Sequence, residues 1–204
     1  MRIGIYFFFV LFTLQLFGQD TLYYASGEIK AIGQIDRNTK EGKWLYFYPD
    51  GTKNAILSYD QGFLDGLQLY HDENGILSGE ENWVDDLQQD TTKNYFSNGQ
   101  LKRIGIFRDG LYAGVWKYYY GSGSIEQIGA YADGLPDSSW ITYHPNGQKS
   151  QEGLFNDGVM DGMWFYYDEK GRLTYSGEYY LGEKLGIWYI YNKKGKQKKW
   201  KNFD

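Results

Sequence analysis

The chain alternates short runs of strand-forming residues with turn signals. The run Trp44-Leu45-Tyr46-Phe47-Tyr48 is rich in aromatic side chains, which favour β-strands. Asp50-Gly51 follows, and Asp-Gly is a strong hairpin signal because both residues of a tight two-residue turn adopt positive φ. A second run extends from Lys53 to Tyr59. The pattern predicts a β-hairpin over residues 44–59.

This pattern recurs every 24 residues. Turn glycines recur at Gly27, Gly51, Gly75, Gly99, Gly123, Gly147, Gly171 and Gly195. Tryptophans fall on one grid at Trp44, Trp116, Trp140, Trp164 and Trp188. No insertion or deletion interrupts the register, and such self-similarity is the signature of a repeat architecture. The sequence therefore predicts an all-β fold: an elongated, single-layer antiparallel β-meander of 24-residue hairpins, with about fifteen strands extending roughly 70 Å.

Turn geometry predicts the register of each hairpin. If residues 50 and 51 form a two-residue turn, paired positions sum to 101, and Trp44 lies opposite Leu57. The same rule places Trp116 opposite Gly129, and we expect the indole to lie across that cross-strand glycine. The glycine-containing segment 109–114 is expected to be a loop between hairpins.

Period-two alternation divides the side chains between two faces. One face holds the tryptophans and the strand glycines. The other holds an aromatic column, beside which we expect a polar column that includes Asn54 and Lys102. A face of tyrosines beside polar residues is suited to a half-wet surface. The candidate binding face comprises Tyr95, Tyr119, Tyr143, Tyr167 and Tyr191.

The first residues have the features of a secretory signal peptide. Arg2 precedes an apolar stretch from Ile3 to Phe17, and Gly18 is a small residue at a plausible cleavage point. The alternative, a membrane anchor, needs about 20 apolar residues. We therefore expect a signal peptide at 1–18, a repeat domain of about seven and a half units at 19–204, and an exported protein: periplasmic, envelope-associated or secreted.

Composition and charge exclude several classes of protein. The chain has no Cys, which excludes disulfides and thiolate chemistry. The net charge of −5 argues against nucleic-acid binding, which favours basic proteins. Aromatic residues make up 20% of the chain, and the mean hydropathy of −0.61 does not suit a helical bundle.

No pattern in the sequence predicts catalysis, a cofactor or a metal site. His71 lies in the aromatic column and His144 beside it, so both are interpreted as substitutes for tyrosine-type residues. The segment Gly121-Ser122-Gly123-Ser124 occupies a hairpin turn and lacks the strand-to-helix setting of a nucleophile elbow or phosphate loop. We therefore expect no enzyme activity.

One stretch departs from the repeat and is acidic. Gln68 and Thr92 replace tryptophan, and residues 60–90 contain nine acids and no Lys or Arg. The stretch is either a binding patch for a basic partner or cation, or the result of drift on a solvated surface. The candidate acidic patch comprises Glu80, Glu81, Asp85, Asp86 and Asp90.

A lysine cluster lies near residue 200. It comprises Lys193, Lys194, Lys196, Lys198, Lys199 and Lys201. Such a run either contacts an anionic surface or protects an edge strand from pairing with other chains. Membrane contact is expected nowhere else in the chain.

The repeat resembles MORN repeats. The matching residues in one unit are Gly162, Trp164, Tyr167, Gly171, Gly177, Tyr179 and Gly182. The chain looks especially similar to bacterial MORN-variant proteins labelled YwqK-family antitoxins, over about residues 23–204. The resemblance implies a single-layer β-sheet without catalytic machinery that acts by binding, and for the bacterial label it implies toxin neutralisation.

These observations leave three functional hypotheses. The first is a non-enzymatic exported module that binds a protein, in an antitoxin-like or immunity-like role or as an envelope scaffold. The alternative is a cell-wall or carbohydrate-binding module in which rows of aromatic residues stack on sugar rings. Lipid association is opposed by the net negative charge outside the lysine cluster.

Overall fold

The computed structural model describes residues 18–204, so the expected signal peptide lies outside the described residues apart from Gly18. The described residues form 17 β-strands and no helix. The strands are β1 (Asp20–Tyr23), β2 (Ile29–Asp36), β3 (Thr39–Phe47), β4 (Lys53–Asp60), β5 (Phe63–Leu64), β6 (Gly66–His71), β7 (Leu77–Val84), β8 (Leu87–Tyr95), β9 (Leu101–Arg108), β10 (Leu111–Tyr119), β11 (Ile125–Ala132), β12 (Leu135–Tyr143), β13 (Lys149–Asn156), β14 (Val159–Tyr167), β15 (Leu173–Tyr180), β16 (Glu183–Tyr191) and β17 (Gln197–Phe203).

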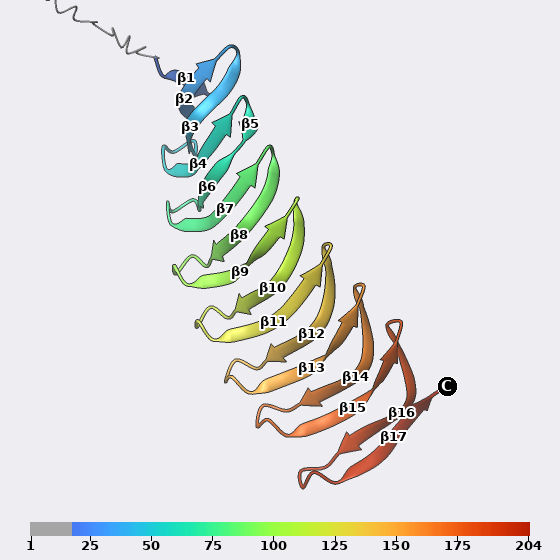
Figure 1. The fold of residues 1–204 in the computed structure, drawn as a ribbon. Coiled ribbons are helices and arrows are strands. Elements are labelled where there is room, and N and C mark those ends of the chain that lie inside the picture. The colour runs from blue at the N-terminus through green and yellow to red at the C-terminus, as the bar shows by residue number, and fades with distance from the viewer. Residues whose placement is uncertain (1–17) are drawn as a thin grey trace, which may run out of the picture.

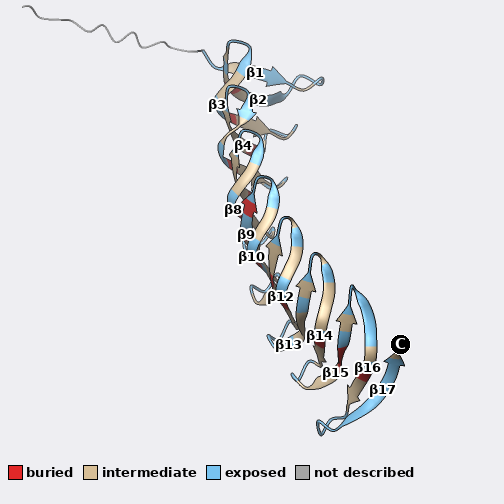
Figure 2. Ribbon diagram, turned by 45° about the vertical axis from the view of Figure 1, so that its right-hand side comes forward, coloured by how far each residue is buried: buried red, intermediate tan, exposed pale blue. Residues whose placement is uncertain are grey.

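The strands form one open antiparallel sheet in which chain neighbours pair with each other. β5 and β6 are two pieces of a single strand position, and both pair with β4. Figure 1 shows the hairpins stacked along one long axis with their turns at two opposite edges. Figure 2 shows that buried residues occupy short bands inside the strands, between exposed and half-buried segments. The predicted all-β meander of hairpin repeats is confirmed.

Two-residue turns occur at one edge of the sheet, where the sequence predicted loops. Arg108 pairs with Leu111 across Asp109-Gly110, whose φ angles are 51° and 77°. Positive φ at both central residues defines the type I′ turn, whose twist matches that of paired strands. The expected loop over 109–114 is therefore wrong: strand β10 starts directly after the turn.

Three-residue turns occur at the opposite edge, where a two-residue turn was predicted. The Tyr48 N–H donates to the Thr52 carbonyl at 2.8 Å, and the Gly51 N–H donates to the Tyr48 carbonyl at 2.9 Å. Gly51 has φ of 87°, whereas Asp50 does not have positive φ. Because Asp-Gly also suits a type I turn closed by a left-handed glycine, the dipeptide alone does not distinguish the two turns.

A β-bulge cancels the extra turn residue. Phe47 pairs with Lys53, but the register shifts before Tyr46, which pairs with Ala55. The predicted pairing of Trp44 with Leu57 is therefore confirmed. The polar column expected opposite Phe47 is wrong by one residue, because Asn54 is the extra residue of the bulge.

Each indole lies on the glycine of the preceding strand. A Cβ added to Gly105 would lie 2.0 Å from Cδ2 of Trp116, and one added to Gly153 would lie 2.2 Å from Cδ2 of Trp164. Trp116 pairs with Gly129 as predicted. The expectation that its ring lies across Gly129 is wrong, because the ring covers Gly105 of the preceding strand. The same packing joins the other strand glycines to their tryptophans: Gly33 to Trp44, Gly129 to Trp140 and Gly177 to Trp188.

A second bulge beside each tryptophan makes this packing possible. Between β9 and β10 the register jumps from Ala113 to Lys117, and Gly114 adopts φ of 61°. The indole N–H of Trp116 donates to the Ile106 carbonyl at 3.2 Å. The other four grid tryptophans make the same bond, so each ring fills the bulge and also satisfies a backbone acceptor.

The unit in which Gln68 replaces tryptophan keeps the same hydrogen bond with a smaller side chain. Gln68 is fully buried, and its Nε2 donates to the Ser58 carbonyl at 3.0 Å while its Oε1 accepts from the Ser58 N–H at 2.7 Å. Leu57 replaces the strand glycine of that unit. The exchange of a tryptophan–glycine pair for a glutamine–leucine pair conserves the packing of the sheet.

Candidate binding surface

The five tyrosines of the candidate binding face lie on one face of the sheet and are half-buried. Alternation along β8, β10, β12, β14 and β16 places them on the face opposite the tryptophans. They are Tyr95, Tyr119, Tyr143, Tyr167 and Tyr191. The structure brings them into one row near the three-residue turns.

Three of these hydroxyls bind neighbouring strands of the same sheet. Tyr95 donates to Glu80 Oε1 at 2.6 Å, and Tyr167 donates to Glu152 Oε1 at 2.6 Å. Burial, followed by the adjacent carboxylate, raises the pKa of Tyr95 to about 12, and the same causes raise that of Tyr167 to about 12. The Tyr191 hydroxyl shares a hydrogen bond with Ser176 Oγ at 2.9 Å. The polar ends of these three tyrosines are therefore already engaged within the sheet.

The same face also carries a stripe of exposed apolar side chains that the sequence analysis missed. Val115 and Met163 directly precede tryptophans, so alternation directs them to the opposite face. We call these residues the apolar stripe: Ile106, Leu111, Val115, Leu135, Leu154, Val159, Met163 and Ile187, which are 38–54% exposed. The signal was present in the sequence, because most of these positions repeat at 24- or 48-residue spacing.

The five acids of the candidate acidic patch are distributed over several structural positions. Asp86 and Asp90 stand where other units have glycine, and both keep positive φ, at 63° and 58°. Asp86 Oδ1 accepts from the Leu64 N–H at 2.6 Å. Glu80 accepts from Tyr95 and lies 3.3 Å from Lys93 Nζ.

Glu81 and Asp85 are the remaining two acids of the patch. Glu81 Oε2 accepts from the Trp83 indole at 3.0 Å. Asp85, with φ of 48°, is the first residue of a type I′ turn. Each of the five acids thus has a place in a turn, a bulge or a side-chain hydrogen bond, and they do not form one cluster.

The lysine cluster lies on the turn before β17 and on β17 itself, and its six members are exposed. Lys201 Nζ lies 4.7 Å from the centroid of the Phe203 ring. A different lysine, Lys184, lies 4.3 Å from the Trp188 ring and 5.3 Å from the Trp200 ring. The exposed lysines therefore border a group of aromatic rings at β16 and β17.

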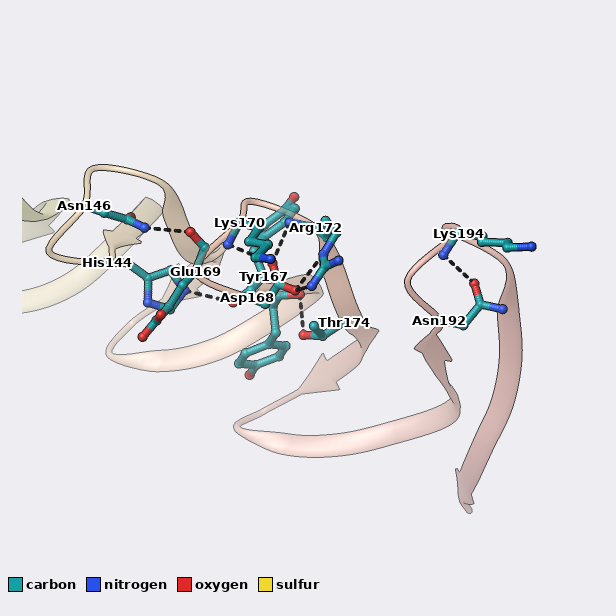
Figure 3. A network of polar contacts seen from close by, with 11 residues as sticks. His144, Asn146, Tyr167, Asp168, Glu169, Lys170, Arg172, Thr174, Asn192 and Lys194 are labelled. Carbon is teal, nitrogen blue, oxygen red and sulfur yellow. Dashed lines mark hydrogen bonds and ion pairs between the residues drawn. The ribbon is translucent and has the colours of Figure 1, made fainter.

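The two histidines have structural environments. His144 Nε2 lies 3.0 Å from the Tyr167 carbonyl, in the place where Tyr120 of the preceding unit donates to the Tyr143 carbonyl at 2.6 Å. Figure 3 shows this contact beside the bond from Asn146 to the Glu169 carbonyl, which joins successive turns. Burial, followed by Lys53, lowers the pKa of His71.

Neither a metal-binding cluster nor a membrane-spanning helix occurs among residues 18–204. Within residues 18–204, no group of three or more His, Asp or Glu side chains has an arrangement that would hold a metal ion. The same residues include no helix of the length and apolarity needed to cross a bilayer. Ser122 and Ser124 face each other within one turn, with their hydroxyl oxygens 3.0 Å apart.

Comparisons with known proteins show similarity to one repeat family in three segments of the chain. The model of a family described as MORN repeat variant matches residues 40–61, 113–133 and 136–157. No curated protein matches the chain. A solved structure titled "Crystal Structure of TcdB2-TccC3-Cdc42" contains a similar chain with 13% identity and a TM-score of 0.18; the match covers 89% of this chain and 14% of that one. Three segments of the chain, each centred on one hairpin of the sheet, thus match the MORN repeat variant family.

Proposed function

We propose that the protein is a non-enzymatic repeat protein that binds a protein partner along the face opposite its tryptophans. The supporting observation is the apolar stripe, whose members are 38–54% exposed and recur on one face over strands β9 to β16. Isolated exposed apolar residues are normal, but a set of them that recurs on one face marks an interaction surface. The row of tyrosines beside the stripe adds amphipathic contact area, which is common in protein interfaces.

Burial of the tryptophans favours a protein partner over a carbohydrate. Trp44 and Trp116 are fully buried, and Trp140, the most accessible of the grid tryptophans, is 6% exposed. A sugar ring needs an accessible aromatic face on which to stack, and these indoles face glycine backbone instead. Carbohydrate binding is the alternative function. It would use Trp200, whose ring is accessible because the residue is 47% exposed.

The proposal includes export from the cell. The apolar segment from Ile3 to Phe17 supports it, and in this proposal Gln19 is the first residue of the mature protein. Sequencing the N-terminus of the protein purified from its native source tests this part. Met1 at that terminus would contradict it.

An antitoxin-like role is one form of the proposed protein binding. Its readout is restored growth of toxin-expressing cells when they also express this protein.

Affinity capture with matched variants tests the binding surface. Wild-type protein, Val115→Glu/Met163→Glu on the apolar stripe, and Ser97→Glu/Ser122→Glu on exposed turns are immobilised separately. Each double variant adds two negative charges, so the two differ in where the charges lie. Each is exposed to an extract of the native source, with and without prior proteolysis of the extract.

The proposal predicts a retained protein that binds wild type and the turn variant, is lost with the stripe variant, and disappears after proteolysis. Equal retention by both variants would contradict binding through the stripe. Retained polysaccharide that survives proteolysis would favour the carbohydrate alternative. Circular dichroism of both variants checks that the sheet remains folded.

A further inference from the structure

A depression of about 600 Å³ interrupts the packed surface of the sheet where β8, β9 and β10 approach the three-residue turns. Its lining includes Asn94, Phe96, Lys102, Arg103, Tyr119 and Glu126. It adjoins the unit in which Thr92 replaces tryptophan. The hollow thus coincides with the departure from the repeat.

Two substitutions relative to neighbouring units account for the space. Asn94 stands at the position that Tyr70 and Tyr118 occupy 24 residues before and after it. Phe96 stands at the position of Tyr120, whose hydroxyl donates to the Tyr143 carbonyl at 2.6 Å. Phe96 has no hydroxyl to offer the equivalent Tyr119 carbonyl. The depression therefore combines lost aromatic volume with a lost hydrogen-bond donor.

Two cations line this space. Lys102 is exposed, and its Nζ lies 5.7 Å from the centroid of the Phe96 ring. Arg103 Nε donates to Asn94 Oδ1 at 2.6 Å, and one of its terminal nitrogens donates to the Tyr112 hydroxyl at 3.0 Å. These bonds use two of the five N–H donors of the guanidinium and fix its orientation. One acid, Glu126, lies on the wall.

We propose that this depression binds a carboxylate side chain of the protein partner, held by Lys102 and Arg103. The inference rests on the proposed protein-binding function. It requires the partner to reach around the edge formed by the three-residue turns, because Arg103 lies on the tryptophan side of the sheet, with its guanidinium 5.8 Å from the Trp116 ring. The planar guanidinium matches a carboxylate, and the Tyr119 carbonyl can accept an N–H from the partner's backbone. Because the chain carries a net charge of −5 and Glu126 borders the site, a singly charged group fits better than a doubly charged phosphate.

Lys30 provides a matched control for Lys102. The two residues occupy the same repeat position three units apart, and Lys30 Nζ lies 5.8 Å from the Tyr24 ring. In that unit Tyr24 keeps its hydroxyl, which donates to the Phe47 carbonyl at 2.7 Å. Leu22 and Ala31 stand where Asn94 and Arg103 do. Lys30 therefore lies beside an aromatic ring as Lys102 does, but without the neighbouring arginine and the carbonyl that has lost its tyrosine donor.

NMR titration of ¹⁵N-labelled protein tests the site without any knowledge of the partner. The probes are the capped peptide acetyl-Gly-Glu-Gly-amide, its Gln analogue and inorganic phosphate. The Glu peptide is expected to shift the amide signals of Lys102, Arg103 and Tyr119 saturably, with millimolar affinity. Lys102→Ala should weaken binding about fivefold, as expected for one partly exposed charge pair, whereas Lys30→Ala should leave it unchanged.

A second variant fills the space and keeps both cations. Asn94→Tyr restores the aromatic residue of the neighbouring units and should abolish the shifts. Equal responses to the Glu and Gln peptides, a response to phosphate alone, or equal weakening by Lys30→Ala would overturn the proposal. Equal retention of the partner by the stripe and turn variants, together with an intact peptide response, would refute the proposed function of the apolar stripe and leave this site in place.

Discussion

Substitution of a strand glycine by alanine tests the packing of indole on backbone. Gly105→Ala would place a Cβ 2.0 Å from Cδ2 of Trp116, whereas ordinary contacts are 3.4–4 Å. The fully buried indole would have to move by about 1.5 Å to regain normal contact. Its neighbours Phe107 and Tyr112 limit that movement, with ring centroids 5.3 and 4.4 Å away.

The cost can be estimated from these contacts. Overpacking a well-packed site costs about 1–3 kcal/mol. Loss of the indole bond to the Ile106 carbonyl adds about 1 kcal/mol. The sum, about 3 kcal/mol, lies below the 3–5 kcal/mol that complete removal of a buried tryptophan side chain typically costs.

Gly121→Ala is the matched control, because a Cβ there meets no atom within 4 Å and the residue does not have positive φ. The free energy of unfolding is measured in urea by tryptophan fluorescence and by circular dichroism. Two probes are needed because a repeat sheet can unfold in parts. Gly105→Ala should lose about 3 kcal/mol and Gly121→Ala should change by less than about 1 kcal/mol. Equal stabilities of the two variants would refute the packing argument.

A double variant gives an independent check. Gly105→Leu with Trp116→Gln copies the natural pair Leu57 and Gln68 of an earlier unit. The two changes should be coupled by more than about 1 kcal/mol, so that the double variant is more stable than the sum of the single variants predicts. Additive losses would show that the pair is not a packing exchange.

Three further predictions concern individual side chains. Asp90→Val should destabilise by about 1–2 kcal/mol because φ is 58°, whereas Asp90→Gly should not; equal urea midpoints would contradict a backbone role for Asp90. Hydrogen bonds from Arg172 hold the pKa of Asp168 at about 2. The stability that they add to the fold is therefore present above pH 4 and lost as pH falls through about 2. Arg172→Ala should raise that pKa in an NMR titration, and an unchanged value would contradict the pairing. The pKa of Tyr95 is raised to about 12, so its protonated hydroxyl adds to the free energy of unfolding below pH 10, and this stabilisation is lost as pH rises through about 12. Glu80→Gln should lower that pKa in an ultraviolet titration, and no change would show that the carboxylate is not its partner.

Much of the fold was predictable because the repeat is strictly periodic. The 24-residue grid gave the hairpins, and the sum rule gave the pairing of Trp44 with Leu57. The turns at both edges were predicted wrongly, because Asp50-Gly51 and Asp109-Gly110 are the same dipeptide in two different turns. The two turns differ in the number of residues between the paired strands. The pairing of Trp44 with Leu57 does not show this number, because the bulge near Phe47 compensates for the extra turn residue.

The surface was less predictable than the fold. Alternation placed the tyrosines on one face, but the engagement of Tyr95 by Glu80 depends on a side chain 15 residues away. The apolar stripe depends on exposure, which follows from the bulge at Gly114 and from the absence of any covering layer over the described sheet. The depression at Asn94 arises from a departure from the repeat, which shows where side-chain volume is lost but not how the remaining side chains lie.

The most direct test of the central claim is site-specific photo-crosslinking in the native source. A photoreactive residue replaces Met163 on the apolar stripe, or Lys170 on an exposed turn as the control. The account predicts a discrete protein adduct from position 163 and none from position 170. No protein adduct at 163, or the same adduct at both positions, would contradict binding through the face opposite the tryptophans.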